Sequence, residues 1–412
     1  MSRPATAPTA WRVVGWFGFV SLAADMVYEG ARSVYGPVLA ALGASAVVVG
    51  LVTGAGEAVA LVLRLAFGPL ADRTGRHWTL TILGYGLTAI CVPLLALAPR
   101  LGAAGLAFAV TMILLERLGK AVRSPSKSAL LARVAAAVGR GRGFGVHKAL
   151  DQVGAFAGPL VVSAAAAVAS LWWGLAVLAV PGAVAMLLLL ALRRRVPDPA
   201  AYDARPPAPD DAPAIPRGWW AEAVGAGLSP DFFRYALAAS LTTGGLVTWG
   251  VIGYHVTVDG LLPVAAVPLL YAAAMAVEAV AALAVGAAYD RTGARVLLVV
   301  PVLVGLVPAL ALGSTLAAVL AGVVAWGIAQ GVQDSTVKAV VADLVAAPRR
   351  ATAYGVFAGV QGLLAVVGGV AAGWLYERSL LALVAVVALS QVVALGLLAD
   401  TFRRSAPRRR AG

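Results

Sequence analysis

The chain is short of cysteine and histidine, with one and three respectively among its 412 residues. Cys91 alone cannot build a disulfide scaffold or a cysteine-based metal site. His77, His147 and His255 lie far apart and show no ligand spacing. Phosphate-binding glycine turns and nucleophile motifs are also missing. We therefore expect no metal, no cofactor and no ATP-driven pumping, and we predict that the protein is not an enzyme.

Charged residues are scarce as well. They make up 12% of the chain against 61% hydrophobic residues, and the mean hydropathy is +0.89. A water-soluble domain has about 25% charged residues, so this composition indicates an integral membrane protein. Apolar runs of roughly 20 residues, without the alternation of a barrel strand, predict membrane-spanning helices. The expected fold class is an all-α membrane protein.

The basic residues do not indicate a nucleic-acid partner, although the net charge is +13, because no folded basic domain carries them. They fall mostly in short loops on one face of the expected bundle, where they orient a membrane protein. Because loops rich in lysine and arginine face the cytoplasm, we expect both termini in the cytoplasm and the protein in the cell membrane. The first span lacks an evident cleavage site, so we expect it to be retained.

The hydropathy pattern predicts twelve spans in two sets of six. The expected spans are 11–42, 46–67, 78–98, 103–122, 144–169, 171–192, 231–254, 262–285, 296–312, 316–340, 351–376 and 380–401. This predicts three parts: an N-terminal six-helix half at 1–195, a cytoplasmic proline-rich linker at 196–229 and a C-terminal six-helix half at 230–412. Ser229, Pro230 and Asp231 form a helix-start pattern.

A short charged motif recurs in the two halves. It covers Gly68 to His77 after the second span, and Gly286 to Arg295 at the matching place in the second half. Both copies contain Gly-x-x-x-Asp-Arg-Thr-Gly, and we interpret each as a turn between apolar runs. A repeat of this length indicates duplication of a six-helix unit.

The motif and its place resemble the loop between helices 2 and 3 of the major facilitator superfamily of membrane transporters. Among those transporters the drug/proton antiporters are the most similar in their motifs. The resemblance implies two pseudo-symmetric six-helix bundles, and a conformational latch at the cytoplasmic helix ends. That role falls to Gly68, Asp72, Arg73, Gly75, Arg76, Asp290 and Arg291. The alternative is an ordinary charged loop.

The first span carries ionisable residues at helical spacing. Asp25, Glu29 and Arg32 are at i, i+4 and i+7, so they share one face. Ionisable groups inside spans usually face the bundle interior and mark a pathway. Two acids and one base leave one carboxyl group without a partner on its own helix, and such a group can bind a proton near neutral pH. The alternative is that arginines neutralise the set and only lock the helices.

Two further residues are candidates for proton coupling. Glu57 lies near the middle of the second span. Arg117 matches the buried arginine of the superfamily's helix-four signature, which the resemblance ties to proton transfer. Lys120 and Ala121 depart from the glutamine and glycine of that signature.

The fifth span combines polar residues with a small-residue motif. Gly154, Gly158 and Pro159 resemble the helix-five motif of antiporters, although Val162 and Ser163 replace its later glycines. Glycines four residues apart allow close helix packing, and a proline favours a bend. The alternative is packing alone. Polar residues that we expect along the substrate pathway are Arg32, Lys148, Asp151, Gln330 and Gln361.

These features predict a monomeric transporter that moves a small molecule across the bilayer by alternating access. Proton-coupled efflux of an amphipathic compound is the favoured function. One alternative is uptake of an organic anion or siderophore-like ligand, favoured if Arg32, Arg117 and Lys148 converge on an anion. A second alternative is a non-transporting or lipid-handling protein with the same fold, for which a cavity open sideways to the bilayer is expected.

Overall fold

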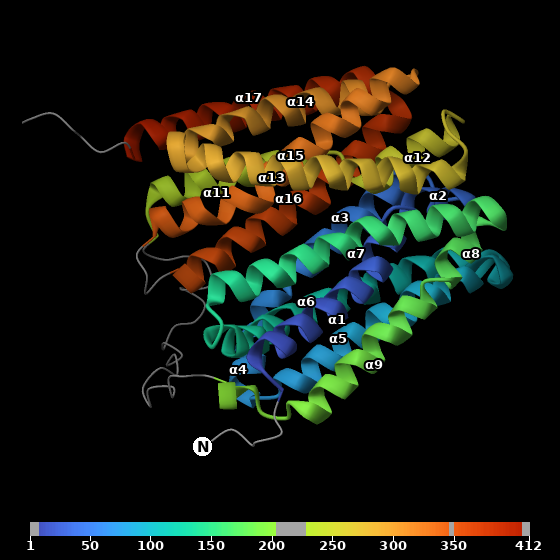
Figure 1. Ribbon diagram of the computed structural model, residues 1–412. Coiled ribbons are helices and arrows are strands. Elements are labelled where there is room, and N and C mark those ends of the chain that lie inside the picture. Colours follow the sequence, from blue (N-terminus) through green and yellow to red (C-terminus); the bar gives the residue numbers. More distant parts are fainter. Residues whose placement is uncertain (1–7, 203–227, 346–349, 406–412) are drawn as a thin grey trace, which may run out of the picture. The chain divides into compact units, whose positions relative to one another are not determined.

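The computed structural model describes residues 8–202, 228–345 and 350–405, and within these ranges all regular structure is helical (Figure 1). Eleven helical segments are long and apolar enough to cross a membrane. One of them, His77–Ala136, is 60 residues long and is interrupted by the 3₁₀ segment η1, where Gly102 leaves helical geometry with φ 52°. It therefore contains two spans, which gives the expected twelve.

The first half begins with a span broken after Arg32, into α1 and α2. Its helices are α1 (Ala10–Arg32), α2 (Tyr35–Ala41), α3 (Ala46–Val62), α4 (Arg64–Thr74), α5 (His77–Leu94), η1 (Leu95–Ala104), α6 (Gly105–Ala136), α7 (Arg140–Val168), α8 (Leu171–Ala176), α9 (Ala179–Arg195) and η2 (Pro199–Tyr202). Residues 203–227 of the expected linker lie outside the described part of the chain.

The second half begins at the expected helix start, since the Ser229 hydroxyl accepts a hydrogen bond from the Phe232 N–H at 3.2 Å. Its helices are α11 (Pro230–Gly245), α12 (Trp249–Val258), η3 (Val264–Ala266), α13 (Val267–Thr292), η4 (Gly293–Leu298), α14 (Val299–Ala311), α15 (Leu316–Leu344), α16 (Arg350–Arg378) and α17 (Leu380–Ser405).

The interpretation of the repeated motif as a turn is wrong for most of its length. α4 continues through Asp72 and Arg73 to Thr74, and only Gly75 and Arg76 separate it from α5. Gly75 ends α4 with φ 63°, and Gly293 follows α13 with φ 65°. A left-handed residue after the last helical turn is a common helix C-terminus, and glycine adopts it at little cost. The duplicated element is therefore a helix end with a glycine stop.

The fourth span is also longer than predicted. We expected it to end at Val122, whereas α6 runs without interruption to Ala136. The extension is amphipathic: Leu130, Leu131 and Val134 are buried against Val13 and Phe17 of α1. Because this packing stabilises the helix outside the apolar stretch, hydropathy alone placed its end too early.

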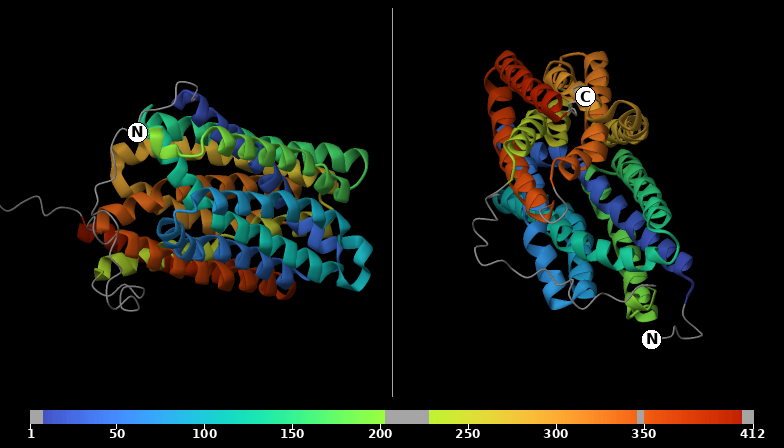
Figure 2. Two further views of the ribbon diagram at one scale, coloured as in Figure 1. Left: turned by 90° about the horizontal axis from the view of Figure 1, so that it is seen from below. Right: turned by 90° about the vertical axis from the view of Figure 1, so that its left-hand side faces the viewer.

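The helices form two compact units. The first contains residues 1–34, 62–217 and 264–272, and the second contains 35–61, 218–263 and 273–412. Each unit thus includes a piece of the other sequence half, and the division at 195 and 230 stays a prediction. In the first unit α5 lies beside α6, which can be followed in Figure 1 and Figure 2. A Cβ on Gly84 would meet the backbone of Gly119, which explains why these helices approach closely.

The second unit is held together by glycine contacts between helices of both sequence halves. A side chain on Gly50 of α3 would meet the backbone of Gly369 on α16. The Gly36 position of α2 is equally close to the backbone of Gly250 on α12. The Thr53 and Thr248 hydroxyls are 2.8 Å apart beside this contact.

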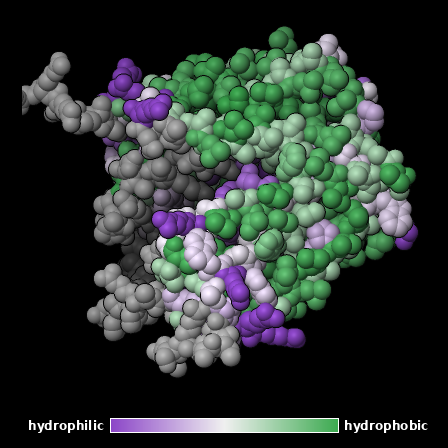
Figure 3. All heavy atoms as spheres, in the orientation of Figure 1, coloured by the Kyte–Doolittle hydropathy of each residue, from purple (hydrophilic) through white to green (hydrophobic). Residues whose placement is uncertain are grey.

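Apolar side chains cover the outer surface of the helices. On the face shown in Figure 3 hydrophobic residues predominate, with hydrophilic residues between them, most of them toward the left and the lower edge. Val168, Leu283 and Leu381 are 89%, 78% and 79% exposed. Such exposure indicates a lipid-facing surface, because a soluble protein would bury large aliphatic side chains of this kind.

Candidate functional site

A carboxyl pair lies between α1 and α7. The side chains of Asp25 and Asp151 lie close enough to interact directly, and Asp25 is half-buried. An ionised carboxylate only accepts hydrogen bonds, so a bond between two carboxyl groups requires a proton on one of them. Two carboxylates at such close range repel each other, so the pair is a candidate for binding one proton between its two acids.

Glycine packing brings the two acids together. A Cβ on Gly154 would run into the backbone carbonyl of Leu22, and one on Gly158 into that of Met26. These contacts fix the register of α7 on α1. Asp151 precedes Gly154 by three residues, so it lies on the same face of α7, one turn nearer the start of α1.

Two lysines and a serine surround the carboxyl pair. The Ser21 hydroxyl donates to Asp151 Oδ1 at 2.7 Å, and Lys127 Nζ donates to Ser21 Oγ at 3.2 Å. Lys148 Nζ lies 3.1 Å from Asp151 Oδ2 and is 67% exposed. Both cations favour the ionised form of the carboxyl groups.

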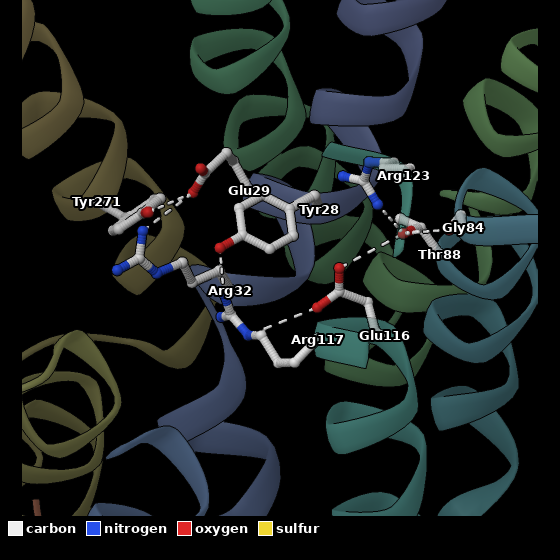
Figure 4. A network of polar contacts seen from close by, with 9 residues as sticks. All are labelled: Tyr28, Glu29, Arg32, Gly84, Thr88, Glu116, Arg117, Arg123 and Tyr271. Atoms are coloured by element: carbon white, nitrogen blue, oxygen red, sulfur yellow. Dashed lines mark hydrogen bonds and ion pairs between the residues drawn. The ribbon is translucent and has the colours of Figure 1, made fainter. Parts of the chain in front are cut away.

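A second polar network lies farther along α1 (Figure 4). Tyr271, at the start of α13, donates its hydroxyl hydrogen to Glu29 Oε2. The same oxygen lies 3.7 Å from Arg32 Nη1. This network links the first span to a helix of the second sequence half.

Beside it, Arg117 of α6 donates to the Tyr28 hydroxyl and lies 3.5 Å from Glu116 Oε2. Both charged residues are buried, with relative exposures of 3% and 0%. Thr88 of α5 donates to Glu116 Oε1 at 3.5 Å and accepts from Arg123. The sequence did not lead us to predict Glu116 as the partner of Arg117. Its position directly before this arginine in the sequence could have indicated the pair.

Removing one member of the buried pair tests its structural role. Arg117→Met leaves Glu116 in an apolar interior without its nearest cation, so we expect the free energy of unfolding to fall by about 3 kcal/mol. The double variant Glu116→Gln/Arg117→Met removes both charges and is expected to be more stable than the single one. Unfolding curves of the purified proteins in detergent provide the measurement. If the two variants were equally stable, the loss of free energy of unfolding in Arg117→Met would not come from leaving the Glu116 charge without its partner.

The second unit has its own polar chain, in which Gln361 of α16 donates to Thr243 Oγ1 at 3.0 Å and Thr243 donates to Gln333 Oε1 at 3.0 Å. Gln330 is half-buried on α15, and Glu57 is half-buried on α3. Thr243 joins two helices here, and a pair of threonines in an apolar run gave no sequence signal.

The predicted latch residues lie at helix ends. Asp72, Arg73 and Arg76 are exposed, and within the described chain none of them forms an ion pair. Arg291 is exposed on the last turn of α13, while the side chain of Asp290 lies outside what the structure describes. The latch stays a prediction.

Each of the three cations whose convergence would favour an organic anion has an acid nearby. Arg32 lies at Glu29, Arg117 at Glu116 and Lys148 at Asp151. The convergence of these cations on an anion stays a prediction.

The sequence profile described as Major Facilitator Superfamily matches residues 17–312 and 262–412. The chain belongs to the major facilitator superfamily. A relative from Mycobacterium tuberculosis (strain H37Rv), itself an uncharacterized protein, is 48% identical over 396 residues, covering 96% of this chain and 93% of the relative.

Solved structures show the same superfamily fold. A mutant of the nucleoside transporter NupG superposes with a TM-score of 0.76 at 15% identity, covering 95% of this chain and all (100%) of that one. A bacterial homolog of the human lysosomal transporter Spinster gives a TM-score of 0.68 at 16% identity, with 97% and 96% coverage. This superfamily chain is thus a multi-pass membrane protein with a transporter fold.

Proposed function

We propose that this protein is a proton-coupled exporter that moves a small molecule by alternating access. The observation that carries the proposal is the close approach of the Asp25 and Asp151 carboxyl groups inside the membrane-spanning helices, where the two acids would share a proton. Membership of a transporter superfamily and the fold of solved transporters support the secondary-transport part.

Asp25 is the proposed proton carrier, with Asp151 as its partner. Lys127, acting through Ser21, and Lys148 stabilise the fully ionised pair, so they favour release of the proton. Proton coupling requires that the pair be protonated on one side of the membrane and deprotonated on the other, as the two faces open in turn.

Export is proposed because of the antiporter-like motif. Gly154 and Gly158 form the closest contacts between α7 and α1, directly beside the carboxyl pair. A change in protonation of Asp25 and Asp151 would therefore affect the contact between α7 and α1. The motif at this contact resembles the one that the superfamily's antiporters carry.

A growth and accumulation screen tests the export function. Cells that produce the wild type are compared with cells that produce Asp25→Asn across a panel of inhibitory compounds. We expect lower accumulation of at least one compound in wild-type cells, abolished by a protonophore and by the substitution. Higher accumulation in wild-type cells would instead indicate uptake.

Lipid handling is a second candidate, favoured by a cavity of about 160 Å³ between α11, α16 and α17. Its apolar lining includes Val367 and Val386, which are 53% and 51% exposed, so the cavity opens at the outer surface. Transfer of a fluorescent phospholipid between the leaflets of reconstituted vesicles would support this candidate. Transfer at the rate of protein-free vesicles would exclude it.

A further inference from the structure

Lys120 of α6 lies near Glu116 but takes part in no hydrogen bond of the networks around Asp25 and Glu116. Its ammonium group stands over the Tyr28 ring, 3.7 Å from the ring centroid. Among the described residues it has neither a hydrogen bond nor an ion pair within 4 Å, and its side chain is half-buried in a membrane-spanning helix. Three N–H donors therefore remain available on a charge that is partly removed from water.

The neighbouring acids do not neutralise this charge fully, because Glu116 is shared by Arg117, Arg123 and Lys120 and the other acids have partners of their own. Glu116, one turn earlier on α6, faces Arg117 and Thr88. Glu29 faces Tyr271 and Arg32. Asp25 faces Asp151, which in turn contacts Lys148.

The tyrosine contact also has a consequence for the ligand. The Tyr28 hydroxyl is bound by Arg117, so the ring is held in place and supports the lysine through a cation–π contact. Lys120 and Lys127 are seven residues apart, which puts them on the same face of α6 and about 10 Å apart along its axis. This face therefore carries two ammonium groups.

We propose that the cargo is an organic anion and that Lys120 binds its carboxylate or phosphate group. A cation that outnumbers the acids around it inside a span is stabilised by an anionic partner, so the excess positive charge here indicates the charge of the ligand. A cationic cargo would be repelled at this position. This inference rests on the proposed transport function and specifies its substrate class.

The sign of the charge fits export by proton exchange. A proton moving inward and a monoanion moving outward both transfer positive charge inward. An inside-negative membrane potential therefore drives the exchange in the proposed direction.

Ligand binding to the purified protein in detergent tests the proposal without a proton gradient. The probes are aromatic carboxylates and aromatic phosphates, with aromatic amines of matched size as cationic counterparts, and the measurement is the shift of the thermal unfolding midpoint with probe concentration. We expect stabilisation by members of the anion set alone. Stabilisation by the amines alone, or by none of the anions, would overturn the proposal.

Variants of α6 locate the binding residue. Lys120→Gln is expected to weaken anion binding about tenfold or more, because it removes charged hydrogen-bond donors. Lys120→Arg keeps the charge and should retain anion binding. Arg133→Gln removes a charge from the same helix and should leave anion binding unchanged. Unchanged binding in Lys120→Gln would contradict the assignment. Asp25→Asn should still bind the anions, so a failure of proton coupling and a failure of anion binding are separable.

Discussion

In reconstituted vesicles, Asp25→Asn is expected to lower the pH-driven accumulation of an exported compound by about 5- to 150-fold, the range of typical coupling free energies between two ligands. Asparagine resembles the protonated acid in shape but cannot release a proton. The variant should therefore still exchange the compound down its own gradient. The assay compares uptake into inside-out vesicles with and without an imposed pH difference, using a compound found by the accumulation screen.

Asp151→Asn is expected to show the same loss, since it removes the second member of the pair. Asp400→Asn is the matched control, because Asp400 pairs with Arg404 on α17 and lies outside the carboxyl pair. If Asp25→Asn kept the pH response of the wild type, the carrier would have to be another group.

Gly158→Ala is expected to lower the free energy of unfolding by about 1–3 kcal/mol, the usual range for an overpacked contact. The added methyl group would meet the backbone of Met26, which cannot move aside without shifting α1. The same shift would separate Asp151 from Asp25, so the variant should also lose pH-driven transport.

Gly145→Ala provides the control on the same helix. No atom lies within 4 Å of a Cβ at this position, and alanine favours a helix over glycine by about 0.5–1 kcal/mol. Its stability should be unchanged or higher. A Gly158→Ala variant that was as stable as Gly145→Ala would mean that α7 does not depend on this close contact.

Helix positions could be predicted from the sequence because lipid imposes a length on each apolar run. The helix ends were harder. The motif after Gly68 looked like a turn because Asp72, Arg73 and Arg76 are polar, yet the first two continue α4 into its last turn. In the same way α6 continues past Val122, because Leu130 and Leu131 bury one side of a basic segment. Hydropathy does not detect helices that leave the membrane.

The site was predicted only in part. Helical spacing placed Asp25, Glu29 and Arg32 on one face, but their partners depend on tertiary packing. Asp151 reaches Asp25 because two glycines fix the register of α7 on α1. Tyr271 reaches Glu29 across about 240 residues of sequence. Such long-range partners cannot be derived from the spacing of residues in one helix.

Infrared spectroscopy of the purified protein tests the shared proton most directly, because it needs no cargo. A protonated carboxyl group has a carbonyl stretching band that an ionised carboxylate lacks. The wild type should show this band at neutral pH, and the part assigned to the pair should disappear at alkaline pH and be missing in Asp25→Asn and Asp151→Asn. The account would be contradicted if neither substitution removed a protonated carboxyl band from the spectrum at neutral pH.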